Sequence, residues 1–212
     1  MDEEERVRGA AEHKAAALHH LGPEEGAGAT IWARGVKDNL ALHQEARRRI
    51  PTPRGATEHP LETWERLYAA AFVIVIAMDQ ILSYADRVLA LTGDVELRKA
   101  RDRFHDTATD TKALRDLVAH LEAYAVGEGW RQTGKRKNLP PIAERNLATL
   151  MWWPDSGGTM LRLGHEGVDL SSAALQAIEL AKVVELVRAR HLRLAGEEAD
   201  AALRRQYPIE GD

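Results

Sequence analysis

The sequence predicts an all-α protein, an antiparallel four-helix-bundle-like fold with a small β-hairpin inserted before the last long helix. Three observations favour this fold class. Apolar residues recur every three or four positions over long stretches of the 212-residue chain. Glycines, prolines and capping residues divide these stretches into segments of helix length, and such helices pack as antiparallel neighbours. A single stretch places turn residues between two short apolar runs, as a hairpin does.

The composition predicts a soluble globular protein in the cytoplasm. The net charge of -4 provides no overall attraction to a polyanion, so any RNA-binding surface has to be a local basic patch. Cysteine is absent, which excludes disulfides and cysteine nucleophiles and fits a reducing compartment. The acidic N-terminus has no secretory pattern. The longest apolar run, residues 67–78, is shorter than the roughly 20 residues that cross a bilayer, so no membrane partner is expected.

The first two predicted helices lie in the N-terminal part of the chain. Residues 1–21 are rich in Ala, Glu and Lys, and the glycines at 22–28 then interrupt the helical pattern. We expect residues 1–30 to be an N-terminal appendage with a flexible connection, and residues 31–206 to be a single helical domain. A helix over residues 31–50 ends at Pro51 and has apolar residues at helical spacing, namely Trp32, Val36, Leu40 and Leu42.

Residues 61–92 form the strongest helical pattern, and Thr92-Gly93 ends it. Much of this segment is apolar on nearly every face, so we expect other helices or a dimer interface to surround it. Its apolar positions recur every three or four residues: Trp64, Leu67, Ala71, Val75, Met78, Leu82, Ala85 and Leu89.

Asp94 is a suitable N-cap for the next helix, which is expected to reach about residue 125. The polar stretch 106–111 predicts a bend or break in its middle, which puts Arg115 near a helix start. Residues 148–153 and 159–163 flank the turn signal at 154–158 and predict the hairpin. The last helix begins near residue 168, has Leu175, Ile178, Leu180, Val183, Val184 and Val187 as apolar positions, and gives way to a polar tail after Gly196.

Arg115 and His120 are the principal candidate catalytic residues. An arginine presents a permanent planar cation to a phosphate, and a histidine gains or loses a proton near neutral pH. In a regular helix, residues five apart are separated by about 140° around the axis. A joint site therefore requires either a bend before Arg115 or assembly across a dimer. Asp116 lies four positions before His120, on the same helix face, where it is expected to orient the imidazole.

Arg115-Asp116-x3-His120, on the second long helix of an all-α domain, resembles the R-x4-6-H signature of the HEPN superfamily. The run over residues 114–129 also looks like actinobacterial HEPN-like proteins of unassigned role, and the likeness covers about residues 61–195. The resemblance implies paired helical domains whose motifs line one cleft, and metal-independent RNA cleavage in toxin–antitoxin or phage-defence systems. It implies that His120 moves the proton, that Arg115 neutralises the phosphate and that no cofactor is needed. The implied partners are a second copy, RNA, and an antitoxin or regulator protein.

The same residues allow a second interpretation, so whether the protein is an enzyme stays open. Some HEPN-like domains are non-catalytic modules for binding or dimerisation, and a fold does not settle an activity. In that case Arg115 pairs with a carboxylate such as Glu122 or Glu128, and His120 packs at the edge of the core.

Further candidates for RNA binding follow the motif. The loop at residues 131–138 holds four cations that suit phosphates, or that simply face solvent: Arg131, Lys135, Arg136 and Lys137. Trp153 is a candidate for base stacking, although such a residue more often covers a core. The nine histidines show no spacing typical of a metal site, and no metal is expected. Gly-rich phosphate loops and nucleophile elbows are absent from the sequence.

Overall fold

The computed structural model describes residues 3–21, 28–48, 61–120, 160–163 and 166–206. Almost all of these residues are helical, and the remaining element is one two-stranded antiparallel sheet, which confirms the predicted all-α class with a small hairpin before the last helix. In chain order the elements are α1 (Glu3–His20), α2 (Ala29–Arg48), α3 (Leu61–Thr92), α4 (Val95–Thr107), α5 (Thr111–Ala119), β1 (Met160–Leu163), β2 (Glu166–Asp169) and α9 (Leu170–Gln206).

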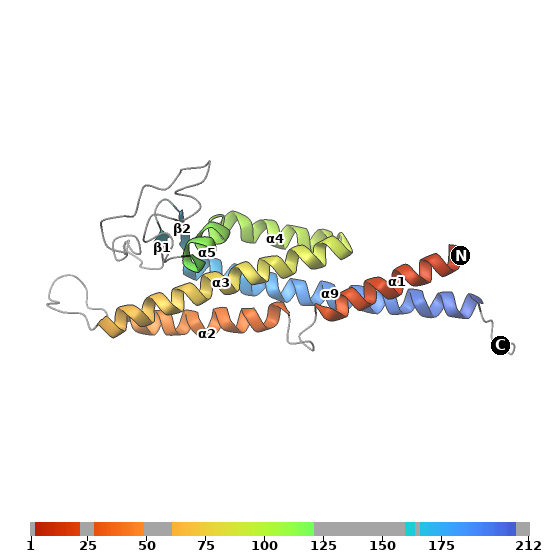
Figure 1. Cartoon of the computed structure of the whole chain (residues 1–212), viewed down its shortest axis with the longest axis horizontal. Coiled ribbons are helices and arrows are strands. Elements are labelled where there is room, and N and C mark those ends of the chain that lie inside the picture. Colours follow the sequence, from red (N-terminus) through yellow and green to blue (C-terminus); the bar gives the residue numbers. More distant parts are fainter. Residues whose placement is uncertain (1–2, 22–27, 49–60, 121–159, 164–165, 207–212) are drawn as a thin grey trace.

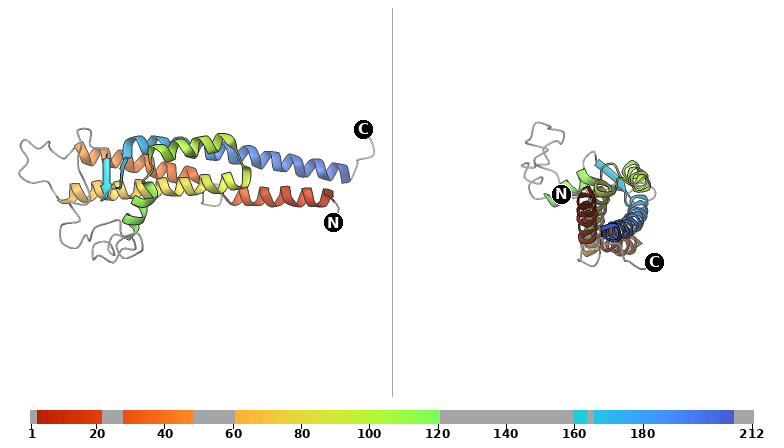
Figure 2. Two further views of the ribbon diagram at one scale, coloured as in Figure 1. Left: turned by 90° about the horizontal axis from the view of Figure 1, so that it is seen from above. Right: turned by 90° about the vertical axis from the view of Figure 1, so that its right-hand side faces the viewer.

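The long helix α9 is the element against which the others are arranged (Figure 1). Its N-terminal half contacts α2, α3 and α4, and its C-terminal half lies beside α1. Helices α1 and α2 follow one another along α9, so the described part of the molecule is elongated, and the start of α1 lies near the end of α9 (Figures 1 and 2). The view along the long axis shows the helices gathered around a common interior (Figure 2).

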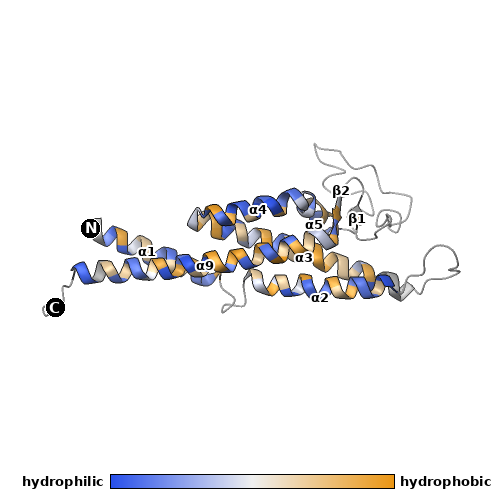
Figure 3. Ribbon diagram, turned by 180° about the vertical axis from the view of Figure 1, so that it is seen from behind, coloured by the Kyte–Doolittle hydropathy of each residue, from blue (hydrophilic) through white to orange (hydrophobic). Residues whose placement is uncertain are grey.

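The core is centred on α3, whose apolar residues face α2, α9 and α5 (Figure 3). By length and composition α3 qualifies as a membrane-spanning helix, but half of that segment is buried inside the protein, as in the core helix of a soluble bundle, so this is weak evidence for a membrane span. One row of completely buried side chains on α3 follows the helical repeat of three or four positions, and Val75 and Ala77 beside it are completely buried too. The row consists of Ile74, Met78, Ile81, Ala85 and Val88.

The predicted break before Arg115 is confirmed. Helix α4 ends at Thr107 and α5 begins at Thr111, after a turn in which the Thr111 hydroxyl donates to the carbonyl of Ala108 at 2.7 Å. Asp94 caps α4 as expected, because its Oδ1 accepts from the backbone N–H groups of Glu96 and Leu97 at 2.9 and 3.0 Å. Helix α5 ends at Ala119 with His120 in the C-cap position, short of the predicted end near residue 125, and residues 121–125 lie outside the described residues.

A hairpin is present before the last helix, but residues 160–163 pair with a strand that the sequence analysis did not predict. Residues 160–163 pair with residues 166–169, in the register Leu161 opposite Val168, and both of these side chains are buried. The expected partner, residues 148–153, lies outside the described residues. A connection of two residues favours the nearer partner, and Val168 offers the apolar side chain that buries Leu161.

Three further details correct the sequence analysis. Leu42 and Leu175 were expected on buried faces, but each is 61% exposed. The nearby His43 lies in the interior instead, at 2% exposure. The segment after Gly196 is no tail within the described residues, because α9 continues to Gln206. Contact with α1, which covers residues such as Ala195, stabilises this extension of the helix.

Candidate functional site

Arg115 lies on α5 and directs its guanidinium towards α3. Its Nε is 3.1 Å from Oδ2 of Asp79, and its Nη1 is 2.9 Å from Oδ1 of Asp116. The Nε atom is buried and has no well-directed hydrogen bond, so its contact with Asp79 is ionic. The side chains of Arg115 and Asp79 are 32% and 12% exposed. The predicted bend before Arg115 therefore brings this cation against a buried carboxylate.

Asp79 lies in the middle of the most apolar part of α3. Burial raises the pKa of its carboxyl, and although Arg115 and Lys112 favour the charged form while Asp116 opposes it, the net pKa remains raised. The negative charges of Asp79 and Asp116 are balanced by the positive charges of Arg115 and Lys112. The arrangement holds α5 against α3 and leaves little positive charge for a ligand.

His120 occupies the C-cap position of α5 and is exposed to solvent. Its backbone N–H donates to the carbonyl of Asp116 at 3.2 Å. Among the residues that the structure describes, its side chain makes no hydrogen bond or ion pair with Asp116 or Arg115. The structure thus brings Arg115 and Asp116 together, but the contact expected between Asp116 and the imidazole is replaced by one between Asp116 and the guanidinium.

The candidate RNA-binding residues Arg131, Lys135, Arg136, Lys137 and Trp153 lie outside the described residues, so their role stays a prediction. The same holds for Glu122 and Glu128, which the alternative interpretation offered as partners of Arg115. Within the described ranges, no group of three or more histidines and carboxylates is placed to hold a metal ion.

Asp79 is a functional candidate that sequence reasoning missed. In the sequence it marks only the end of the apolar run at residues 67–78. A single carboxylate inside a strongly apolar helix requires a cationic partner from another element, because a buried unpaired charge is costly. That requirement was the available signal, because the short helix after the predicted break carries two cations, Lys112 and Arg115.

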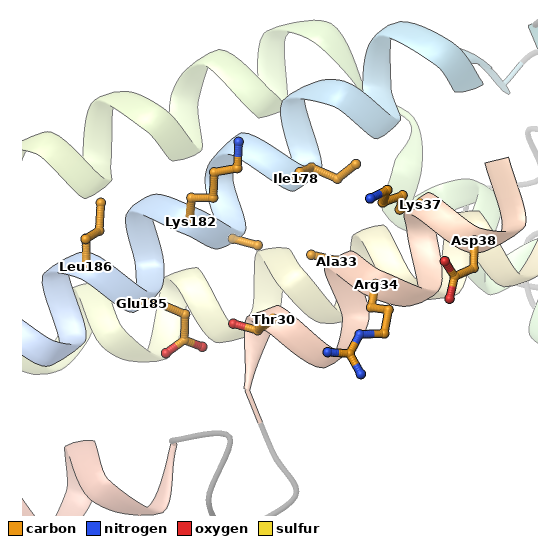
Figure 4. Close-up of a pocket in the computed structure, with 10 residues that line it drawn as sticks. Thr30, Ala33, Arg34, Lys37, Asp38, Ile178, Lys182, Glu185 and Leu186 are labelled. Atoms are coloured by element: carbon orange, nitrogen blue, oxygen red, sulfur yellow. The ribbon is translucent and has the colours of Figure 1, made fainter. Parts of the chain in front are cut away.

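A second site is a groove of about 660 Å³ between α2 and α9 (Figure 4). Ala33 and Ala181 provide its small apolar floor, and Ile178 and Leu186 add aliphatic surface. Thr30, Arg34, Lys37, Asp38, Lys182 and Glu185 complete the lining. Sequence analysis did not find this groove, because it depends on the packing of two helices that are far apart in the chain.

Some charged side chains of the groove already have a partner within the described part of the protein, and others do not. Glu185 accepts from Arg188 at 2.9 Å and from the backbone N–H of Ala29 at 3.2 Å, and so joins α9 to the start of α2. Lys182 is 2.6 Å from Glu179. Within the part of the chain that the structure describes, Arg34, Lys37 and Asp38 make no ion pair, so the uncommitted charge of the groove is mainly cationic.

Comparisons of the chain with family models, with curated proteins and with solved structures give no match. The fold and the two sites are therefore interpreted from their own geometry.

Proposed function

We propose that this protein is a HEPN-like helical interaction module that binds another protein and does not cleave RNA. The observation that supports this function is the placement of the Arg115 guanidinium between the carboxylates of Asp79 and Asp116. A cation that stabilises a phosphate during cleavage has to be preorganised towards the reacting group. Arg115 is instead preorganised towards two carboxylates of its own chain.

An incoming phosphate would have to compete with Asp79 for the guanidinium. Moving Arg115 away would leave the buried carboxylate without its closest cation, and breaking such a pair is strongly unfavourable. Arg115 then acts as a structural residue that fixes α5 on α3. A module of this kind needs an outer surface for its partner, and the groove between α2 and α9 combines exposed aliphatic and charged groups in one place.

A metal-independent endoribonuclease is the second candidate, and one observation favours it. His120 is exposed at the end of α5, and about a third of the Arg115 side chain on the same helix is also exposed. In this function His120 takes the proton from a ribose 2′-hydroxyl and the resulting oxygen attacks the adjacent phosphorus. The bond from phosphorus to the 5′-oxygen breaks, the 5′-oxygen takes up the proton from His120, and a 2′,3′-cyclic phosphate is left. Pairing into a homodimer, and control by an antitoxin or regulator, belong to this second candidate.

An RNA cleavage assay distinguishes the two functions. The full chain is incubated with end-labelled single-stranded RNA and transfer RNA in excess EDTA, together with its His120→Ala and His105→Ala variants. Both histidines are exposed, so both variants should fold, and His105→Ala is the matched control. We expect no cyclic-phosphate products from any of the three proteins. Cleavage by the parent and the His105 variant, lost in the His120 variant, would overturn the interaction module and establish the ribonuclease.

The Asp79→Asn variant sharpens this assay. The substitution removes the carboxylate charge that holds Arg115 and leaves the guanidinium freer to meet a phosphate. If the protein is a ribonuclease, cleavage should increase in this variant and should still depend on His120. If the protein is an interaction module, the variant should be as inactive as the parent.

A further inference from the structure

The outer face of α9 beside the groove has two exposed leucines, Leu175 and Leu186, which are 61% and 71% exposed. Ile178 lies between them and is half-buried against the core. Leu175 and Leu186 are eleven positions apart, which is three helical turns, so both point to the same side of α9 and lie about 16 Å apart along it. Large leucines in a line on one face mark an interaction surface more often than scattered single ones do.

The shape of this surface suits a helix. Helices α2 and α9 run in opposite directions beside one another, and the small side chains of Ala33 and Ala181 leave the groove open between them (Figure 4). The exposed leucines extend past the groove, because Leu175 is not among its lining residues. A small ligand prefers an enclosed cavity that covers most of its surface. An amphipathic helix can lie along the open groove and also cover the leucines that extend over three turns of α9.

The charges determine which kind of helix fits. Arg34 and Lys37 on α2 lie at the rim of the groove and make no ion pair within the described residues, and Figure 4 shows the Arg34 guanidinium directed away from α9. On α9, Lys182 is already paired with Glu179 and Glu185 with Arg188. Asp38 is the one uncommitted acidic group in the lining. Acidic side chains that flank an apolar face would complement this rim. A second copy of the chain that docked through the same face would bring identical cations together, which is unfavourable.

From these observations we infer that the groove between α2 and α9 binds an acidic amphipathic helix of a partner protein. The bound helix places apolar side chains at i, i+4, i+7 and i+11 against Ile178, Leu186 and Leu175. Its flanking aspartates and glutamates meet Arg34 and Lys37. This inference rests on the proposed function and specifies the chemistry of the partner.

The probe is a fluorescein-labelled peptide of about 18 residues, long enough for five helical turns. It has leucines at i, i+4, i+7 and i+11 and glutamates beside them. A matched peptide replaces every glutamate by lysine. Fluorescence anisotropy with the full chain should give a Kd on the order of 10 µM for the acidic peptide and binding at least about tenfold weaker for the basic one. The preference should weaken with added salt, because exposed charges are screened.

Variants then identify the surface. Leu186→Ser should weaken binding of the acidic peptide by about tenfold or more. The double variant Arg34→Glu/Lys37→Glu should reverse the preference and bind the basic peptide more tightly. The matched control is Leu42→Ser, an equally exposed leucine of α2 outside the groove lining, and it should bind like the parent. All of these positions are exposed, and far-UV circular dichroism checks that each variant is folded.

Three results would overturn the inference: absence of binding to the acidic peptide, equal binding of both peptides, or binding that Leu186→Ser and the charge reversal leave unchanged. Sedimentation velocity provides a fourth, because a dimer that Leu186→Ser dissociates would mean that a second copy occupies the groove. A negative result in the peptide-binding experiment can be distinguished from a failure of the proposed function. The RNA cleavage assay does not depend on the groove, so a protein that neither cleaves RNA nor binds the peptide would contradict the inference alone.

Discussion

Asp79 Oδ2 lies 3.1 Å from Arg115 Nε, and this ionic contact joins the middle of α3 to α5. The arginine that looked most suited to phosphate chemistry in the sequence therefore balances a buried carboxylate in the fold. Because burial raises the pKa of Asp79, the charged carboxylate depends on its cationic neighbours. The contact gives a direct test of whether Arg115 is a structural residue.

Arg115→Ala should lower the free energy of unfolding by about 2 kcal/mol, because it leaves Asp79 buried without its closest cation. Adding Asp79→Asn to this variant should restore part of the loss, because the unpaired charge is then gone. Urea denaturation of the parent, the two single variants and the double variant measures the coupling energy. Strictly additive effects would show that the two residues do not stabilise one another.

His43 should make the stability depend on pH. Burial, and to a lesser extent Arg47, lower the pKa of this histidine to about 4, below its ordinary value of 6.5. Between these two pH values the unfolded chain therefore binds a proton more readily than the folded chain does. The contribution of neutral His43 to the free energy of unfolding is complete above pH ~6.5 and is lost as the pH falls towards ~4. The loss from His43 should be about 2 kcal/mol between pH ~7 and ~5.

The measurement compares urea denaturation of the parent and of His43→Gln at both pH values. The glutamine variant keeps a polar side chain that does not titrate, so its stability should change less over this range, whatever its absolute stability. Parallel changes in the two proteins would show that other groups cause the pH dependence.

Asp94 should stabilise the joint between α4 and α9. Burial alone would raise the pKa of its carboxyl, but hydrogen bonds from the Leu97 N–H, His191 and Arg190 outweigh burial and lower it. Asp94→Ala removes the cap of α4 and the partner of both α9 side chains, and should cost about 2 kcal/mol.

Asp94→Asn is the matched control for this joint, because asparagine keeps the cap and loses only the charge. It should cost less than the alanine variant at neutral pH. Since the folded-state pKa of Asp94 is lowered, the stability that its charge contributes is present above its ordinary pKa and is lost as the pH falls through the folded value. The difference between the parent and Asp94→Asn should therefore shrink in acid, and equal costs for Asn and Ala at neutral pH would contradict the assigned cap.

Arg188 should hold α1 against α9. Its guanidinium is buried, contacts Glu185 at 2.9 Å and donates to the carbonyl of Leu18 at 3.3 Å, near the end of α1. Arg188→Ala should cost about 3 kcal/mol and should speed hydrogen exchange in α1 more than in α3. Arg193→Ala, an exposed position on the same helix, is the control and should leave both rates unchanged. Equal acceleration in α1 and α3 would indicate global destabilisation instead.

Local patterns were sufficient to predict most of the helices. The apolar repeat over residues 61–92, the cap at Asp94 and the polar interruption before Arg115 all depend on neighbours within a few positions of one another, and all three are present. Periodicity did not predict which leucines are buried. Leu175 fits the helical repeat and is nevertheless exposed, because burial requires a second element to cover that side of the helix. Leu42 lies about 200° around the helix from Leu40, whereas His43, seven positions after Val36, shares the buried face.

Contacts between distant helices decided both candidate sites, whereas the strand pairing is local, because residues 160–163 pair with the strand that begins at residue 166. Arg115 contacts Asp79 on another helix as well as its neighbour Asp116. The groove exists because α2 and α9 meet with alanines between them. The residue order specifies where the backbone can be helical, since that depends on local sterics and hydrogen bonds. The charge that a side chain meets and the surface left uncovered depend on how distant helices pack.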